Sequence, residues 1–278
     1  MRIAFIITLA IISFHTSVGQ GRLTDDMKET EEQLSASTKQ INQFFRRFNG
    51  EEDEKGNRYY PSDKNYHDPA LRKKYMPVLF DTQTGQVDAA LAKSFISKIT
   101  SKTDPVYLDF HKDDWLAEVN TVFLFKGREI PGTLYMRLQQ QGQGYEWVIE
   151  DVAFEQFQKL FDKDTSDTKK FLHPMSHELD FMTLRKGLEG NKHAEQFTGR
   201  KFEPDYLTIF LYEFNQGNMK FKTVKDVNFH FFSVKGYYFS ISNFNRSGYN
   251  SGWLISSLVA LSSEDEKQQM KNYIYGKN

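Results

Sequence analysis

The sequence predicts an α+β protein in which helices pack on curved antiparallel sheets. Two observations on local pattern support this. Residues 20–50 and 69–100 repeat apolar side chains at helical spacing, whereas residues 105–154 hold short aromatic and aliphatic runs separated by Gly and polar residues. A third observation is the content of 25 Phe and 14 Tyr, because so many rings suit sheets covered by helices or a ring-lined pocket.

The N-terminus has the three parts of a secretory signal. Arg2 supplies a positive charge, residues 3–14 are apolar, and Ser17 and Gly19 are small residues at the places that a signal peptidase reads. A retained membrane anchor is the alternative, but the apolar run is shorter than the roughly 20 residues that span a bilayer. We therefore expect residues 1–19 to be a signal peptide that is cleaved after Gly19. The remaining chain would have no membrane span and would work in the periplasm or outside the cell.

Composition excludes several classes of function. The 36 basic and 37 acidic residues nearly balance, so no single-sign field favours nucleic acid. The absence of Cys excludes a disulfide framework, a thiolate metal site and a Cys nucleophile, and in an exported chain of this size it is typical of bacteria. His173 and His177 have the spacing of zinc ligands on a helix. Pro174 places His173 before that helix, so we expect no metal site and no cofactor.

Boundary residues and period changes place the elements. Asp68 as N-cap and Pro69 at the first helical position predict a helix over 69–80, and another is expected over 86–100. After a candidate boundary between 160 and 171, a further helix is expected over 175–190 and a short one in the polar tail. The strands expected are 106–110, 117–127, 132–140 and 145–154, followed by 206–214, 219–224, 227–236, 237–244 and 252–261.

The two strand regions resemble each other. Val-Asn begins a strand at Val119 and again at Val227, a Lys-Gly turn follows each, and each region closes on a strand led by Trp147 or Trp253. The offsets between these anchors are about 108 residues, which is the size of a small domain. Any two antiparallel meanders share some of these features, so coincidence is the alternative. We predict an N-terminal domain over 20–160 and a divergent copy over 171–278, as two tandem cone-like domains.

Helices followed by a long meander that ends in the strand YEWVIEDV resemble the nuclear-transport-factor-two-like family. The features that carry the resemblance are the Lys-Gly turn and the spacing of Trp147, Ile149 and Val152. The resemblance implies a cone-shaped fold with a pocket. The family includes dehydratases, isomerases and non-catalytic binding modules, so it does not imply one activity. In its signal, the Gln at the cleavage point and its aromatic content, the chain also resembles uncharacterised secreted proteins of gut Bacteroidetes.

Asp109 and His111 are the candidate catalytic residues. If 106–110 is a strand that continues to His111, both side chains leave the same face, and a carboxylate could orient the imidazole as a general base. The alternative, which we favour, is an ordinary surface pair at the end of a strand. Most other carboxylates lie in charge-mixed segments such as EEDEK at 51–55, and these segments are expected to be solvated.

Aromatic and amide side chains are the candidate ligand-binding groups. Rings offer a stacking face and amides offer paired donors and acceptors, as in sugar- or peptide-binding surfaces. His230 could face a pocket, but a core histidine with a hydrogen-bond partner is the interpretation that we favour. The candidates are Tyr135, Trp147, His230, Tyr237, Asn243 and Trp253.

Together these features indicate a secreted, non-enzymatic binding or interaction module of the bacterial envelope. Its expected partners are a small molecule, a glycan or a protein, a second copy of the chain among them. Two alternatives stay open. One is a hydrolase or lyase that acts in a concave sheet pocket, and the other is a structural dimerisation protein.

Overall fold

The computed structural model describes residues 41–53, 55–112, 114–161, 194–199, 201–247 and 250–277. The expected signal peptide, the helix expected over 175–190 and the pair His173 and His177 lie outside these residues. Within the described ranges, no helix is both long and apolar enough to cross a membrane.

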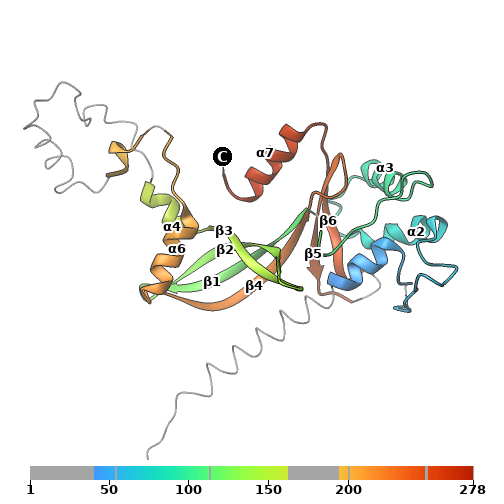
Figure 1. Cartoon of the computed structure of the whole chain (residues 1–278), viewed down its shortest axis with the longest axis horizontal. Helices are drawn as coiled ribbons and strands as arrows, with labels where there is room; N and C mark the ends of the chain where they lie inside the picture. The colour runs from blue at the N-terminus through green and yellow to red at the C-terminus, as the bar shows by residue number, and fades with distance from the viewer. Residues whose placement is uncertain are drawn as a thin grey trace, which may run out of the picture.

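The six strands form one antiparallel sheet in the order β3-β2-β1-β4-β5-β6. Figure 1 shows the strands as long, curved ribbons with helices gathered at both ends. The α+β class is therefore confirmed. The strands are β1 (Trp115–Phe125), β2 (Arg128–Gln141), β3 (Gly144–Ala153), β4 (Met219–Phe231), β5 (Tyr237–Phe244) and β6 (Gly252–Ala260).

The helices form three groups around the sheet (Figure 1). A helix that includes residues 41–49, α2 (Pro69–Tyr75), η1 (Met76–Leu79) and α3 (Ala89–Ile99) lie at the end near β5 and β6. The opposite end carries α4 (Glu155–Gln158), η2 (Lys159–Phe161), η4 (Ala194–Phe197) and α6 (Tyr206–Asn215). The third group is helix α7 (Glu264–Ile274) by itself. Asp68 caps α2 through Leu71 N, with Pro69 at the first helical position, as expected.

The two faces of the sheet have different partners. Trp115 and Ala117 on β1 belong to the large core formed with the first helices, whereas Leu116 between them packs with residues of α7. This alternation follows from the period of two along a strand. In the large core, the rings of Trp115, Phe231 and Phe239 stack in parallel, with centroids 5.4 and 4.7 Å apart.

The two meanders, β1 to β3 and β4 to β6, join through their first strands. Every residue of β1 has a partner on β4, and Val119 lies directly opposite Val227. Two separate cone-like sheets in tandem are therefore not confirmed. Trp147 is half-buried and Trp253 is buried, and both rings contact Phe229, at centroid distances of 6.3 and 4.9 Å. The two tryptophans thus share one core.

Four expectations about local structure were wrong. Residues 206–214 form α6 rather than a strand, because Asp205 caps the helix through Leu207 N and Thr208 N and the helix buries Phe210. Residues 106–110 form no strand. The strands expected over 219–224 and 227–236 are one strand, β4, which has two irregularities in its register with β1. Glu52, in the segment expected to be solvated, is buried.

Candidate functional site

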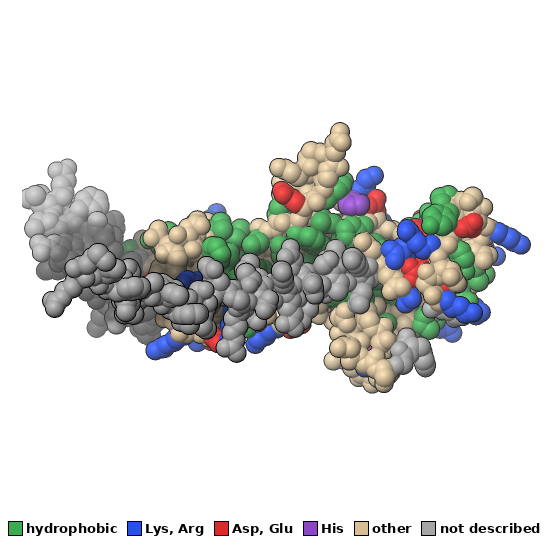
Figure 2. Space-filling view, turned by 90° about the horizontal axis from the view of Figure 1, so that it is seen from below, with side chains coloured by type: hydrophobic (Ala, Val, Ile, Leu, Met, Phe, Trp, Pro, Cys, Tyr) green, Lys and Arg blue, Asp and Glu red, His purple; other side chains and the backbone are tan. Residues whose placement is uncertain are grey.

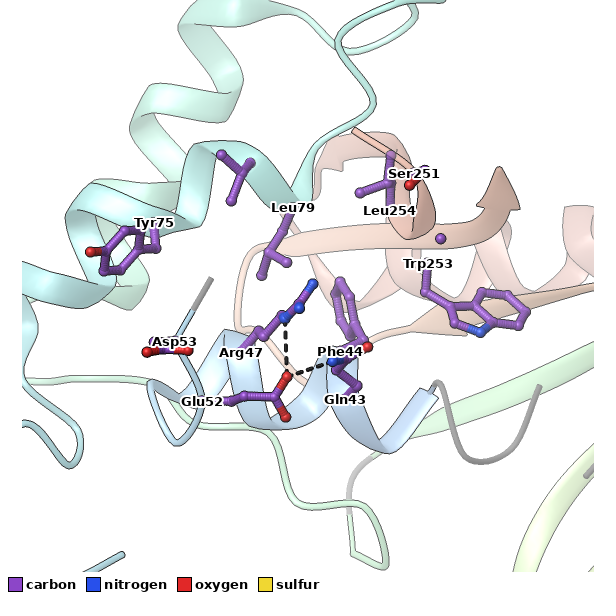
Figure 3. Close-up of a pocket in the computed structure, with 12 residues that line it drawn as sticks. Gln43, Phe44, Arg47, Glu52, Asp53, Tyr75, Leu79, Ser251, Trp253 and Leu254 are labelled. Carbon is purple, nitrogen blue, oxygen red and sulfur yellow. Dashed lines mark hydrogen bonds and ion pairs between the residues drawn. The ribbon is translucent and has the colours of Figure 1, made fainter. Parts of the chain in front are cut away.

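A pocket of about 520 Å³ lies at the end of the sheet near β6 (Figure 3). Segments far apart in the chain form it: the helix over 41–49, the turn after it, the end of α2 with η1, and the first residues of β6. Its volume is in the range of small-molecule sites. The lining residues are Gln43, Phe44, Arg47, Glu52, Asp53, Tyr75, Val78, Leu79, Ser251, Gly252, Trp253 and Leu254.

Glu52 is the most buried charged side chain in this pocket, with 2 % of the side chain exposed. Its Oε1 accepts from Gln43 Nε2 at 2.6 Å and from Arg47 Nε at 3.3 Å, and its Oε2 accepts from Arg46 Nε at 2.8 Å. A buried carboxylate is stable when it is paired and hydrogen-bonded. The cluster of Arg46, Arg47 and Glu52 therefore carries one net positive charge.

Trp253 contributes a donor that is not used. Its indole Nε1 is buried and has no hydrogen-bond partner in the part of the chain that the structure describes. Buried N–H groups nearly always have a partner, so this one is an exception. Because the atom itself is buried, it is not exposed to the pocket, and in Figure 3 the indole ring points away from Arg47 and Glu52. Asn243, another predicted ligand-binding residue, lies directly opposite Trp253 on β5 and is exposed.

Polar contacts hold the two walls of the pocket together. Asn250, just before β6, donates from Nδ2 to Phe80 O at 2.7 Å, and Phe80 pairs with Ile255 in a parallel bridge. Arg246 binds the buried Asp81 at 2.5 Å. Burial alone would raise the pKa of Asp81, but hydrogen bonds from Thr84 and Arg246 lower it. Arg246 and Asn250 are thus used to fix the end of η1 beside β6.

Asp109 and His111 lie in a turn and are both exposed. Asp109 Oδ1 accepts from the backbone N–H of His111 at 2.9 Å, and the imidazole packs on Tyr145 with centroids 4.4 Å apart. Asp109 also lines a second, more open hollow of about 570 Å³ with Arg46, Arg58 and Tyr107. Because the segment is not a strand, the shared face on which the catalytic hypothesis rested does not exist.

His230 is buried and fully hydrogen-bonded, as expected for a core histidine. Nε2 lies 2.7 Å from Glu118 Oε2, and Nδ1 lies 2.8 Å from the hydroxyl of Tyr238. A carboxylate accepts only, so Nε2 carries a proton and donates it to Glu118. Burial raises the pKa of Tyr238 to about 12. With both nitrogens occupied, His230 stabilises the contact between β1, β4 and β5.

The remaining predicted residues are separated. Tyr135 is buried on the α7 face, where its hydroxyl donates to Ile274 O at 2.5 Å and burial raises its pKa. Tyr237 is half-buried on the other face, with its hydroxyl 3.1 Å from Ser94 Oγ. Trp147 packs edge-on against Trp115 at 5.4 Å. Of the predicted residues, Trp253 lines the 520 Å³ pocket, and Asn243 lies opposite Trp253 on β5.

No sequence pattern marks Gln43, Arg47, Glu52 and Tyr75 as residues of one site. The available signal was the pair of arginines at 46 and 47 followed by the acidic run at 51–53, which we interpreted as solvated. Opposite charges five and six residues apart, across a helix end, have no regular spacing that marks them as partners. Their contact depends on the turn at Asn49-Gly50.

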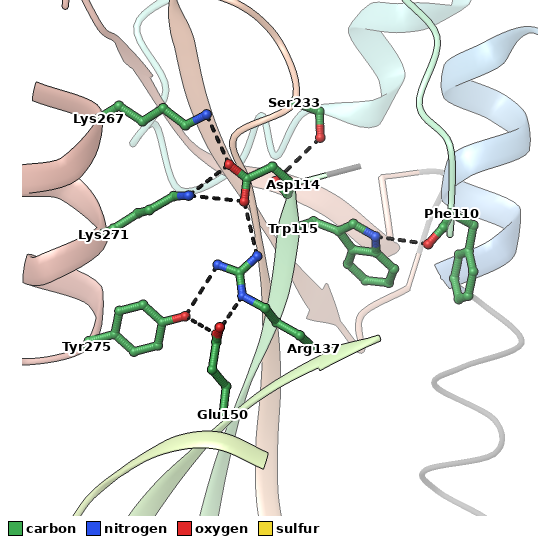
Figure 4. A network of polar contacts seen from close by, with 9 residues as sticks. All are labelled: Phe110, Asp114, Trp115, Arg137, Glu150, Ser233, Lys267, Lys271 and Tyr275. Atoms are coloured by element: carbon green, nitrogen blue, oxygen red, sulfur yellow. Dashed lines mark hydrogen bonds and ion pairs between the residues drawn. The ribbon is translucent and has the colours of Figure 1, made fainter. Parts of the chain in front are cut away.

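Helix α7 is attached to the opposite face of the sheet by a network of ion pairs (Figure 4). The Asp114 carboxylate forms ion pairs with Lys271 at 2.8 Å, Lys267 at 3.0 Å and Arg137 at 3.1 Å. Burial alone would raise the pKa of Asp114, but hydrogen bonds from these three cations lower it to about 2. The Arg137 guanidinium also binds Glu150, which accepts from the Tyr275 hydroxyl. This network holds a helix rather than a ligand.

Within the described residues, no three His, Asp or Glu side chains form a group that could hold a metal ion. No family model, no curated protein and no solved structure matches the chain.

Proposed function

We propose that this protein is an exported, non-enzymatic binding protein that holds a small polar ligand in the pocket between η1 and β6. The observation that carries the proposal is a pocket of about 520 Å³ in which Arg47, with a third of its side chain exposed, lies among apolar and amide side chains. Pockets of this kind combine apolar walls with a few convergent polar groups. Here Leu79 and Leu254 supply apolar surface, while Gln43 and Ser251 supply polar groups.

This lining suits a sugar-like ligand. A sugar presents C–H surface to apolar side chains and hydroxyls to amides, hydroxyls and charged groups. A purely apolar ligand would take water from the exposed end of Arg47 without offering that guanidinium an acceptor.

Export by a signal peptide cleaved after Gly19, the bacterial envelope, self-association and descent of the two meanders from one duplicated unit stay part of the proposal. The resemblance to the nuclear-transport-factor-two-like family also stays a prediction. The alternatives of a hydrolase or lyase and of a structural dimerisation protein stay open, but the exposed turn at Asp109 and His111 offers the catalytic alternative no support.

The change Trp253→Phe tests the proposal. It replaces a side chain that lines the pocket by a smaller aromatic ring and removes part of its contact with the ligand, so we expect about tenfold weaker binding, because about 1.4 kcal/mol corresponds to tenfold. The measurement is calorimetric titration of the best binder from a panel of mono- and oligosaccharides, both neutral and acidic.

Trp147→Phe is the matched control, because Trp147 packs in the same core but does not line the pocket. We expect this variant to bind like the wild type. Equal affinity of both variants for the ligand, or no binding of any saccharide by the wild type, would refute the proposal.

A further inference from the structure

The charged side chains around the pocket differ in how many hydrogen bonds they already make within the protein. If the proposed function holds, this difference indicates the class of ligand. Three charged side chains line the pocket: Arg47, Glu52 and Asp53. The contacts of each side chain decide which of them is free to bind a ligand.

Both carboxylates are already satisfied. Glu52 accepts from Gln43, Arg46 and Arg47, and the shortest two of these contacts, at 2.6 and 2.8 Å, come from Gln43 and Arg46. Asp53 Oδ1 accepts the backbone N–H groups of Lys55 and Asn57, each at 2.8 Å. Its Oδ2 accepts Asn57 Nδ2 at 2.9 Å. The Asp53 carboxylate therefore closes its own turn.

The guanidinium of Arg47 has a hydrogen-bond partner among the described residues at Nε only. Its one hydrogen bond within the described residues runs from Nε to Glu52, at 3.3 Å, and is the longest of the contacts to that carboxylate. In Figure 3 the rest of the guanidinium points away from Glu52. A third of the side chain is exposed. Both Nη groups, with their planar pair of N–H donors, are thus available in the pocket.

A guanidinium fork that is anchored through Nε presents a fixed geometry to a planar oxyanion. Arg binds carboxylates in a bidentate manner for this reason, and holding the fork in place reduces the entropy that binding costs. Glu52 anchors this fork through Nε, while Gln43 and Arg46 supply the shorter contacts to the same carboxylate. Glu52 and Asp53 offset Arg46 and Arg47 in total charge, so the positive charge offered to a ligand is local to the exposed end of Arg47.

We propose that the ligand is an acidic sugar whose carboxylate binds the Nη groups of Arg47, while its hydroxyls contact Gln43 and Ser251. This inference rests on the proposed binding function and makes it more specific. It assigns Arg47 as the residue that selects acidic over neutral sugars.

The test uses matched ligands that differ in charge alone. The probes are trimers of galacturonate, glucuronate and mannuronate, each as the free acid and as the methyl ester, together with neutral hexose trimers. Calorimetric titration of the wild-type protein at neutral pH is expected to show at least one acid form binding tenfold or more tightly than its ester. This preference should weaken with added salt.

The variants are Arg47→Gln, Arg47→Lys and Arg46→Gln. Arg47→Gln should abolish the preference for acid over ester, and Arg47→Lys should retain part of it, because Lys keeps the charge but loses the fork. Arg46→Gln is the control, since it removes the same charge one residue away and breaks the shorter contact to Glu52. It should lower thermal stability at least as much as Arg47→Gln while the preference for the acid persists.

The outcomes separate the two proposals. Binding of a neutral sugar with equal affinity for acid and ester forms would overturn the inference and leave the binding function standing. Loss of the preference in Arg46→Gln as well as in Arg47→Gln would also overturn it, because it would show a general effect of charge. Binding of no saccharide at all would refute the proposed function itself.

Discussion

Arg72 shows how one side chain joins three segments of this fold. It is 2 % exposed, and its guanidinium donates to Phe48 O at 3.0 Å, Ile99 O at 3.1 Å and Val106 O at 2.7 Å. Phe48 and Ile99 lie at the ends of two helices, where carbonyls lack partners and a positive charge is favourable. The guanidinium also lies 4.5 Å from the ring centroid of Tyr107. Burial lowers the pKa of Arg72.

The change Arg72→Lys is therefore expected to destabilise the fold although it conserves charge. A single ammonium cannot reach three carbonyls that a planar fork spans, and each lost bond to a charged donor costs about 1.5–3 kcal/mol. We expect a loss of about 3 kcal/mol in the free energy of unfolding, measured by urea titration. Arg58→Lys, at an exposed arginine, should change it by less than about 0.5 kcal/mol. Similar small changes in both variants would contradict this account.

At the scale of elements, α7 depends on charge more than on apolar contact. None of its residues is buried, and Met270 and Ile274 are only partly buried against Tyr135 and Tyr238. Ser263 caps the helix through Glu266 N. The ion pairs of Lys267 and Lys271 with Asp114 then fix it to the sheet.

This attachment should weaken in acid. The pKa of Asp114 is about 2 in the folded protein, against an ordinary value of 3.8. A carboxylate with a lowered pKa stabilises the fold above its ordinary pKa, and the stabilisation is lost as the pH falls toward the folded value. The difference in unfolding free energy between wild type and Asp114→Asn should thus be constant above about pH 5, decrease as the pH falls toward 2, and be lost only below pH 2. Asp265, at an exposed position on α7, provides the control. If Asp265→Asn changed the unfolding free energy with the same pH profile, the effect would not originate in the ion pairs of Asp114.

At the scale of the whole molecule, the pairing of β1 with β4 decides the architecture. These strands occupy the middle of the sheet and belong to the two halves that sequence analysis assigned to separate domains. The aromatic stack of Trp115, Phe231 and Phe239 crosses the same junction. The core is therefore continuous between the halves.

We accordingly expect the described sheet to unfold in one transition. Tryptophan fluorescence and far-ultraviolet circular dichroism should give the same urea midpoint, because a shared core couples the two meanders. Hydrogen exchange should also show similar opening free energies for the central amides of β1 and β4. Two resolved transitions would instead favour independent tandem domains.

The sequence by itself determined what depends on local pattern. Spacing and residue type alone predict the capped helix after Asp68, the strands of the first meander and the helix in the tail. The α+β class follows from the change between helical and strand periods. These features need no knowledge of distant residues, since capping and periodicity act within a few positions.

Only the tertiary structure decided the features that depend on distant contacts. The aromatic run at 206–214 fits a strand or a helix, and its cap at Asp205 and burial of Phe210 selected the helix. The single sheet depends on a register between residues about a hundred positions apart, such as Val119 and Val227. Arg47 lies beside Glu52 and lines the same pocket as Trp253. These residues come from a helix, a turn and a strand end, and no regular spacing in the sequence relates them. Burial of Glu52 was decided in the same way, because an acidic run is solvated unless the fold supplies cations to pair with it.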